Sequence, residues 1–464
     1  MAQRRAAGRW GAIARWLAPG LAVVGCASAA DRLALPLRTG DDARPRVVDG
    51  RGELPPRQAD AVVARLERDD PGTLIARHLA FMERAGAPPL IAGNATRLLI
   101  DGPETHRAMF EAIAAARRHV LVQTYILESD ATGERLAELL IERRRQGVPV
   151  SLIYDAIGGL GTPSTYFERL REAGVAVCES NPVNPLAGRG VTLNNRDHRK
   201  ILVVDGRVAF TGGINISDVY ASGSASARRR TERGGGWRDT HLQVRGPAVA
   251  AFERLFVDSW SRQRCEPAPG LAGGRSTVAA AGDRVLRVVA TTPEDRGNAI
   301  HAEWLSAFRH AQRSIHVTMA YFVPDPSTLE ALEAAARRGV DVQLVLPGFS
   351  DFWAVLHAGR SHYTRLLDAG VRIHERRDAL LHAKTAVVDG VWSTVGSANM
   401  DWRSFLHNEE INVIVIGEGF GGEMQRMFET DLAASVPVDP AAWARRGPLE
   451  RLKEQVARAF EHWL

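Results

Sequence analysis

The sequence predicts an α/β protein of two similar α-β-α sandwich halves, each with a mixed sheet, related by an approximate twofold axis. Three observations lead to this prediction. The 464-residue chain carries the pattern His-x-Lys-x-x-x-x-Asp twice, at 198–205 and 382–389. Matched landmarks surround both copies in the same order, which indicates an internal duplication. Apolar β-rich runs alternate with helical patterns in both halves, as expected of a sheet covered by helices.

Residues 1–26 have the composition of a targeting leader. Four arginines precede an apolar run of ten residues at 16–25. Ten helical residues cover about 15 Å, roughly half of a bilayer core, which is too short for a simple membrane span. A basic stretch before a short apolar run is typical of a secretory signal. The stretch "VVGC" resembles a bacterial lipobox in which Cys26 is lipidated, with a signal-anchor or a non-targeting leader as alternatives.

Residues 27–87 are expected to form a tether followed by N-terminal helices. The stretch from 31 to 73 is polar and contains several prolines, among them Pro45 and Pro71, which suits an extended linker. Helical patterns occupy 59–68 and 73–86.

The duplicated part divides into a first half at 88–270 and a second half at 271–432. The matched landmarks lie 184 to 196 positions apart, and one of them aligns Tyr125 with Tyr321. Near-continuous apolar strands before Asp205 and Asp389 indicate sheets that are covered on both faces. The aligned segments are 119–130 with 314–325, 148–155 with 340–347, and 170–177 with 366–373.

Residues 433–464 are expected to contain a C-terminal amphipathic helix. Its large apolar residues fall on one helical stripe. Packing of this stripe onto the protein is the expected arrangement, and insertion into a membrane interface is the alternative. The stripe consists of Leu449, Leu452, Val456, Phe460 and Trp463.

Composition argues against several classes of function. The net charge is +5, but the four leader arginines leave a charge near +1 for the remaining residues. A nucleic-acid partner is therefore not expected, because such binders show a broader basic excess. Neither a Cys-x-x-Cys nor a His-Glu-x-x-His motif is present, so we expect no metal and no cofactor. Cys178 and Cys265 either pair in an oxidising compartment or stay buried as free thiols.

The repeated motif predicts one phosphate site built from two copies. Residues i and i+2 of a strand face the same side, so His198 projects with Lys200, and His382 with Lys384. Histidine can act as a nucleophile or as a proton carrier near neutral pH. The adjacent lysine charge favours an anionic group and disfavours a divalent metal.

Other polar residues are expected to complete this site. Glycine-rich segments after the motifs supply neutral hydrogen-bond donors for phosphate oxygens, which stabilise charge in a transition state. Asp205 and Asp389 complete the catalytic motifs, but each ends a strand before a glycine, which favours turn or structural roles. The candidate phosphate ligands are Asn215, Ser397 and Asn399.

Each histidine also needs a partner that fixes its tautomer and orientation. Alignment of "WRDTHLQVRG" with "HNEEINVIV" places Asp239 opposite Glu410. We expect Asp239 to orient His198, and Glu410 to orient His382.

These motifs resemble the phospholipase D superfamily over roughly residues 88–432. Stretches such as "NNRDHRKILVVDG", "WRDTHLQVRGPAV" and "GSANMDWRSFLHNEE" resemble its bacterial cardiolipin synthase branch. The resemblance implies the phospholipase D fold and a metal-free double displacement through a phosphatidyl-histidine. His198 is then the expected nucleophile and His382 the acid/base, although the sequence does not settle which is which. A phospholipase D that hydrolyses phospholipids, a nuclease and an inactive lipid-binding protein are the alternatives.

The resemblance also implies partners and a location. The substrates are expected to be anionic phospholipids, with phosphatidylglycerol as acceptor and phosphatidylglycerol or phosphatidylethanolamine as donor. Synthases of the best-known type carry two N-terminal membrane spans, which this sequence lacks, so it is more similar to the shorter, peripherally attached synthases. We therefore expect attachment to the bacterial cell membrane, peripherally or through a lipid on Cys26. The need for a protein partner is left open.

Overall fold

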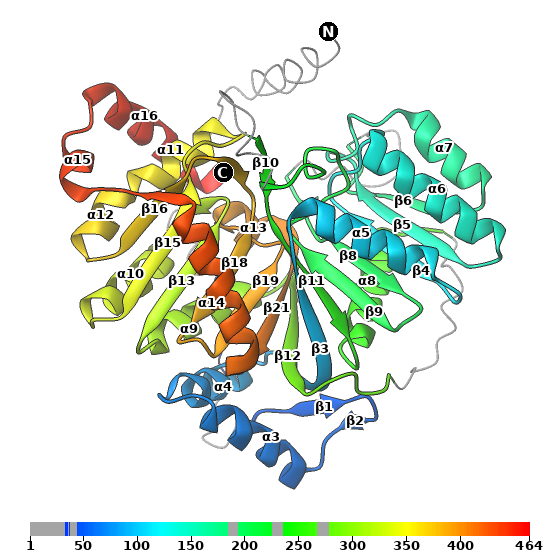
Figure 1. The fold of residues 1–464 in the computed structure, drawn as a ribbon, viewed down its shortest axis with the longest axis horizontal. Helices are drawn as coiled ribbons and strands as arrows, with labels where there is room; N and C mark the ends of the chain where they lie inside the picture. Colours follow the sequence, from blue (N-terminus) through cyan, green and yellow to red (C-terminus); the bar gives the residue numbers. More distant parts are fainter. Residues whose placement is uncertain (1–32, 36, 38–43, 184–193, 225–234, 267–277) are drawn as a thin grey trace.

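Two halves, each a twisted sheet faced by helices, lie side by side in the computed structural model (Figure 1). The structure describes residues 33–35, 37, 44–183, 194–224, 235–266 and 278–464. The leader, including Cys26, lies outside these residues. The expected α/β fold of two similar halves is confirmed.

The two sheets share one strand order, which reflects the duplication. In each sheet, three neighbouring strands are parallel to one another. The strand that follows the motif histidine pairs with this group in the antiparallel direction, and the remaining strands are antiparallel as well. The first-half order is β6 (Ala176–Ser180), β5 (Val150–Asp155), β4 (Val120–Thr124), β8 (Ile201–Val204), β9 (Val208–Gly212), β11 (Thr240–Arg245) and β3 (Leu90–Ile100). The second-half order is β16 (Arg372–Arg376), β15 (Asp341–Pro347), β13 (Ser314–Met319), β18 (Lys384–Val388), β19 (Trp392–Gly396), β21 (Asn408–Ile416) and β12 (Arg284–Thr291). Antiparallel pairing of β3 with β12 joins both sheets.

Helices cover the outer faces, and a shared core fills the space between the halves. Side chains of α8 and α14 pack in this central core with strands of both sheets. The first-half helices are α5 (Asp101–Ala114), α6 (Ala131–Arg145), α7 (Ser164–Glu172) and α8 (Val249–Arg262). The second-half helices are α9 (Ala299–His310), α10 (Pro326–Arg337), α11 (Trp353–Ser361), α12 (Tyr363–Asp368), α13 (Trp402–Leu406) and α14 (Glu418–Ala433).

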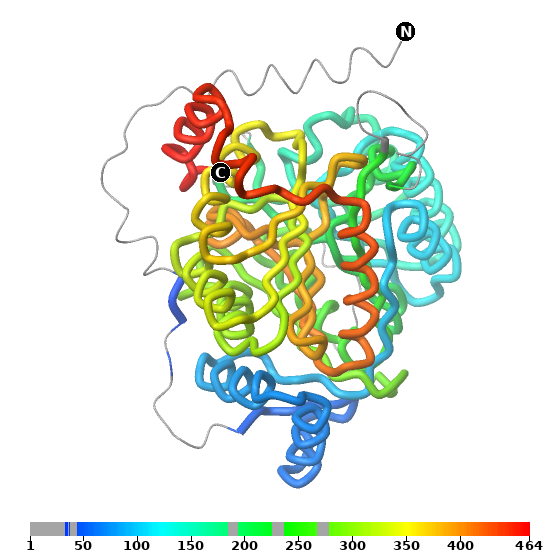
Figure 2. The backbone as a smooth tube through the Cα atoms, turned by 60° about the vertical axis from the view of Figure 1, so that its left-hand side comes forward, coloured from blue at the N-terminus to red at the C-terminus, as the bar shows by residue number. Residues whose placement is uncertain are grey.

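Part of the segment expected to be a tether is folded onto the sheet. It forms β1 (Val47–Asp49), β2 (Gly52–Glu53) and α3 (Pro56–Arg68), and β1 pairs in parallel with β3. The next helix, α4 (Leu74–Arg84), buries its apolar face against α9 of the second half. Proline and polar composition suggested an extended linker, but a few apolar side chains such as Val47 provide enough buried contact to fix it. Figure 2 shows these elements in blue at one end of the molecule.

The two "VVDG" stretches form equivalent hairpin turns. Asp205 and Gly206 connect β8 to β9, and Asp389 and Gly390 connect β18 to β19. All four have positive φ, at 58°, 65°, 53° and 70° respectively. An Asp-Gly pair is favoured in tight hairpins because both residues tolerate the left-handed region.

Cys178 and Cys265 form a disulfide, with their Cα atoms 5.8 Å apart. It links β6 to the chain after α8, within the first half. Of the two alternatives that the sequence leaves open, the structure has the paired cysteines. Among the described residues, none of the helices has the length and apolar character needed to span a membrane.

The C-terminal segment covers one end of the second half. It contains β22 (Ser435–Pro437), α15 (Pro440–Ala444), α16 (Pro448–Arg458) and a 3-10 turn at Glu461–Trp463. The apolar stripe expected to pack onto the protein points outward instead, because Glu454 and Ala457 on another face of α16 make the buried contacts. The remaining short strands are β7 (Arg196–Asp197), β10 (Gly235–Arg238), β14 (Phe322–Val323), β17 (Ala379–Leu381) and β20 (Met400–Asp401).

Candidate active site

Two short strand pairs connect the halves next to the motif histidines. β7 of the first half pairs in parallel with the beginning of β21, and the His198 amide then donates to the Glu409 carbonyl at 3.0 Å. β10 of the first half pairs in parallel with β17, and the His382 amide donates to the Arg238 carbonyl at 2.8 Å. Each histidine is therefore fixed to backbone of the opposite half.

This crossing decides which carboxylate serves which histidine. His198 Nδ1 lies 3.0 Å from both carboxylate oxygens of Glu410, and His382 Nδ1 lies 2.7 Å from Asp239 Oδ2. The expected pairing of Asp239 with His198 and of Glu410 with His382 is wrong. The alignment found both carboxylates correctly, but only strand pairing between the halves determines the partner.

Both imidazoles are deeply placed, with His198 9% and His382 6% exposed. Burial lowers the pKa of His198 to about 4, although Glu410 acts in the opposite direction. Burial and the Lys384 charge lower the pKa of His382 as well. Since a carboxylate holds each Nδ1, each ring keeps Nε2 for other partners.

The motif lysines lie beside the histidines as the strand pattern predicts. Lys200 Nζ donates to the His198 carbonyl at 2.7 Å, and Lys384 Nζ donates to the His382 carbonyl at 2.5 Å. Burial lowers the pKa of Lys200 to about 7, and it lowers the pKa of Lys384. Glu410 and the other orienting carboxylate interact electrostatically with both lysines, so the two motifs form one charged cluster.

The orienting carboxylates stay ionised in this cluster. Although burial opposes ionisation, the His198 ring and the lysine charge lower the pKa of Glu410 to about 2. In the same way, His382 and Lys384 lower the pKa of Asp239. A buried carboxylate beside an imidazole is suited to stabilise the imidazolium when the ring takes up a proton.

Asn399, one of the expected phosphate ligands, has a buried side-chain oxygen without a hydrogen-bond partner in the described part of the chain. That oxygen can only accept a hydrogen bond, so a contact from Asn399 to a phosphate oxygen would have to come from its Nδ2 group. Asn215 Nδ2 donates to the Tyr220 hydroxyl at 2.9 Å, and its oxygen accepts from the Ile126 amide at 3.1 Å. Ser397 differs from the expectation, because its hydroxyl donates to Glu410 Oε2 at 2.5 Å. This hydrogen bond positions the Glu410 carboxylate.

Gly213 occupies the position that matches Ser397 in the first half. A Cβ atom there would lie 2.2 Å from Asp239 Oδ1, too close for any side chain. The two halves therefore support their carboxylates differently: a serine bonds Glu410, whereas a glycine makes room for Asp239.

Asp205 and Asp389 contact backbone rather than the histidines. The carboxylate of Asp205 accepts from the amides of residues 117–119, at 2.6 to 3.1 Å. Asp389 accepts from the amides of residues 312–314, at 2.8 Å each. Both carboxylates anchor the segment that leads into the neighbouring strand, which fits the structural role favoured by their place before a glycine.

Aromatic rings surround the histidines, and sequence reasoning did not select them as site residues. Tyr125 lies edge-on to His198 with ring centroids 5.0 Å apart, and its ring also faces Lys200 Nζ at 5.3 Å. Tyr321 is the matched residue beside His382, at 6.4 Å. The alignment of Tyr125 with Tyr321 was the available signal. The ring of Trp237 lies 5.2 Å from His382.

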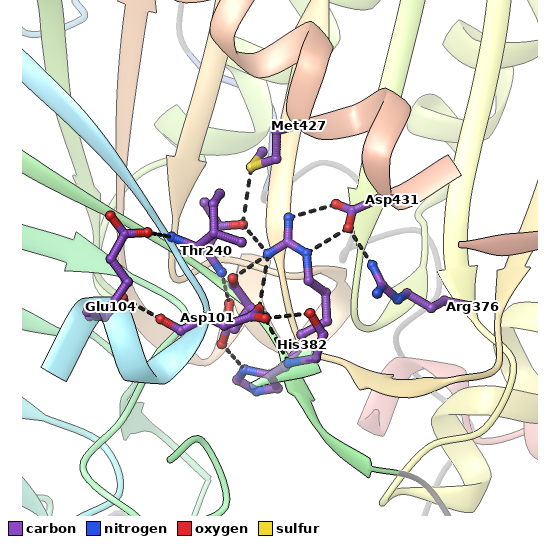
Figure 3. A network of polar contacts seen from close by, with 12 residues as sticks. Asp101, Glu104, Thr240, Arg376, His382, Met427 and Asp431 are labelled. Atoms are coloured by element: carbon purple, nitrogen blue, oxygen red, sulfur yellow. Dashed lines mark hydrogen bonds and ion pairs between the residues drawn. The ribbon is translucent and has the colours of Figure 1, made fainter. Parts of the chain in front are cut away.

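A buried ionic network supports the second histidine (Figure 3). Arg238 donates from Nε and Nη2 to the Asp431 carboxylate of α14, at 2.6 and 2.7 Å. Arg376 of β16 also donates to Asp431. Since the Arg238 carbonyl accepts from the His382 amide, this network ties the crossing strand to the second-half helix.

Comparison with known proteins decides the family. Residues 109–224 and 305–432 match the family described as "Cardiolipin synthase, PLD-like domain", with one histidine motif in each segment. The chain is 36% identical to cardiolipin synthase A of Pseudomonas aeruginosa over 380 residues, which cover 82% of this chain and 75% of that protein. The chain belongs to the cardiolipin synthase family of the phospholipase D superfamily.

Other comparisons agree with this membership. A cardiolipin synthase of Geobacillus is 35% identical over 387 residues, covering 82% of this chain and 74% of the relative. The crystal structure of phosphatidylserine synthase from Haemophilus influenzae matches with a TM-score of 0.60 and 13% identity, covering 80% of this chain and 95% of that one. At this identity the latter likeness concerns the fold. The cardiolipin synthase family and the fold thus agree with the resemblance found in the sequence.

Proposed function

We propose that the protein synthesises cardiolipin by transferring a phosphatidyl group to phosphatidylglycerol. The observation that carries the proposal is the pair of buried histidines, each held at Nδ1 by a carboxylate of the opposite half. Both rings therefore keep Nε2 for reaction at one phosphorus atom. Membership of the cardiolipin synthase family supports the choice of lipid substrates.

In the first step, Nε2 of His198 attacks the phosphorus of a donor phospholipid. A nitrogen–phosphorus bond forms, the bond to the head-group oxygen breaks, and His382 gives its proton to the departing alcohol. The neutral form of His198 is the nucleophilic one, and burial favours it. Binding of the phosphodiester anion raises the proton affinity of His382, so the ring is charged when it acts as acid.

In the second step, a hydroxyl of the phosphatidylglycerol head group attacks the phosphatidyl-His198. His382 takes up the hydroxyl proton, the nitrogen–phosphorus bond breaks, and cardiolipin leaves. Lys200 and Lys384 stabilise the negative charge on the non-bridging oxygens in both steps. The rings of Tyr125 and Trp237 limit the access of water, which favours transfer over hydrolysis.

We also propose where the reaction takes place. Peripheral attachment to the bacterial membrane, including a lipid on Cys26, is supported by the sequence alone. The Cys178–Cys265 disulfide supports action on the oxidising, extracytoplasmic side, because such bonds persist outside the cytosol.

The test is incubation of the purified protein with labelled phosphatidylglycerol in mixed micelles, followed by separation of the lipids. We expect cardiolipin and free glycerol from the wild type, and at least a thousandfold less product from His198→Ala and His382→Ala. Phosphatidic acid as the main product would replace the proposal with a hydrolase, and cleavage of DNA would replace it with a nuclease. The incubation is repeated with phosphatidylethanolamine as the alternative donor. The free alcohol that is released then shows which of the two lipids donates its phosphatidyl group.

A further inference from the structure

The outward apolar stripe on α16 and on the turn that follows it is exposed and is not covered by any described part of the chain. Its five residues, Leu449 to Trp463 as defined above, are each between 47% and 63% exposed. The helix is held by other residues, since buried Glu454 forms an ion pair with Arg446 at 2.8 Å and Ala457 packs inward. The exposure of the stripe is therefore not the result of a detached helix.

The loop before α11 and the first residue of that helix add further exposed apolar side chains. Helix α16 packs against α11, and Phe352 and Trp353 at the beginning of α11 are also exposed, at 43% and 50%. This loop reaches the active site, because Asp351 accepts a hydrogen bond from the Tyr321 hydroxyl at 2.8 Å beside His382. Figures 1 and 2 show α11 and α16 together at the end of the molecule opposite α3.

The first half presents an apolar side chain from the matching loop. The loop before α11 follows β15, and its counterpart follows β5, at the same ends of the two sheets as the histidines. Leu160 in that counterpart is 56% exposed. The backbone of this loop lies against Tyr125, which contacts His198. Apolar groups from both halves therefore flank the shared site.

Charge and position indicate what covers this surface. Arg451 and Arg458 are exposed on α16 beside the stripe, which favours an anionic partner. The proposed substrates are anionic lipids whose phosphodiester lies at the membrane interface. A protein seated across both halves would separate the histidines from that interface, whereas a bilayer would supply the substrate.

We propose that the α16 stripe, Phe352, Trp353 and Leu160 form a surface that docks the protein on an anionic phospholipid bilayer. The inference rests on the proposed function, because it assigns the orientation in which the histidines meet the lipid head groups. We call these residues the docking surface. The apolar side chains insert at the level of the head groups, and the two arginines contact lipid phosphates.

The test measures partition of the full chain onto vesicles of phosphatidylcholine with phosphatidylglycerol by co-sedimentation. We expect Trp353→Gln/Leu452→Gln/Val456→Gln to weaken partition at least tenfold. Val257→Gln, at an exposed position of α8, is the matched control for Val456→Gln and retains binding. Arg451→Gln/Arg458→Gln is expected to reduce the preference for vesicles that contain phosphatidylglycerol.

A second measurement separates docking from catalysis. Turnover of short-chain phosphatidylglycerol, dispersed as monomers, stays within about twofold of wild type in the triple variant. Unchanged vesicle binding overturns the proposal, as does loss of binding together with short-chain turnover. If the wild type forms a dimer in the absence of vesicles and the triple variant does not, the surface mediates self-association and the docking proposal is overturned. If the wild type binds vesicles through this surface but makes no cardiolipin, the docking proposal stands and the proposed function is contradicted.

Discussion

His198 and Lys200 experience the same burial with opposite consequences for catalysis. Burial keeps the histidine neutral, which suits its proposed role as the nucleophile over a wide pH range. Burial also lowers the pKa of Lys200 to about 7, so the lysine begins to lose the positive charge needed at the phosphate near neutral pH. Burial of both side chains thus favours the proposed attack on phosphorus, but it narrows the pH range in which the lysine can stabilise the phosphate.

These shifts predict the pH profile of kcat/KM for a phospholipid with a p-nitrophenyl head group, whose departure needs no proton from His382. With a His198 pKa of about 4, activity persists below pH 6.5 and falls only as the pH approaches 4. With a Lys200 pKa of about 7, activity falls as the pH rises above 7. Lys200→Arg remains charged, so the contribution of Lys200 to the alkaline fall is expected to disappear and that of Lys384 to remain, with a lower maximum.

The control is the folded fraction at each pH. Between pH 6.5 and 4 the unfolded chain binds the proton that folded His198 refuses, so stability decreases as the pH falls through this window. Activity must therefore be corrected for unfolding. An acid limb near 6.5, or an alkaline limb unmoved in Lys200→Arg, would disagree with the buried cluster described here.

At the scale of elements, the Asp-Gly hairpins explain why an aspartate belongs to the repeated motif. Asp205 lies beyond the end of β8, and its carboxylate gathers the backbone amides that lead into β4. Asp389 does the same before β13. The strands adjacent to the histidine-bearing segments are thereby fixed in both halves.

Replacing Asp205 is expected to lower stability while the folded enzyme keeps its activity. Asp205→Asn retains one acceptor oxygen and tolerates positive φ, so we expect a loss of about 1–2 kcal/mol. Asp205→Ala leaves the amides unpaired in a strained turn, with a loss of about 3 kcal/mol. Thermal unfolding and kcat measure both, and Asp389→Asn is the symmetric control. Lost kcat at unchanged Tm would instead assign a catalytic role.

How far the sequence predicts the elements depends on the range of their contacts. The repeat and its apolar strands predicted the sheets, the motif lysines and both carboxylates, because these follow from local pattern and alignment. The partner of His198 did not follow, since it depends on β7 pairing with β21 across the halves. The role of Ser397 was missed for another reason, since it depends on the pairing of β19 with β21 within the second half, which brings the hydroxyl to Glu410.

At the scale of the molecule, the twofold arrangement places one complete site between two incomplete halves. Each half supplies a histidine and the carboxylate that orients the other half's histidine, so neither half alone holds an oriented ring. Helices α3 and α4 lie at one end of the molecule, whereas α11 and α16, which carry most of the proposed docking surface, lie at the other (Figure 1). Sequence periodicity identified the stripe of α16 but could not show that Glu454 makes the inward contact.

The central claim is that each histidine is oriented by the opposite half, and a phospholipid with a p-nitrophenyl head group tests it most directly. This leaving group needs no proton, so attack by His198 depends on Glu410, while later steps depend on His382 with Asp239. Rapid-mixing absorbance is expected to show a burst of nitrophenol, equal to the enzyme concentration, in Asp239→Asn. In Glu410→Gln release is slow and without a burst. Absence of a burst in His198→Ala identifies His198 as the nucleophile, and with that established, a burst in Glu410→Gln but not in Asp239→Asn would contradict the crossed pairing.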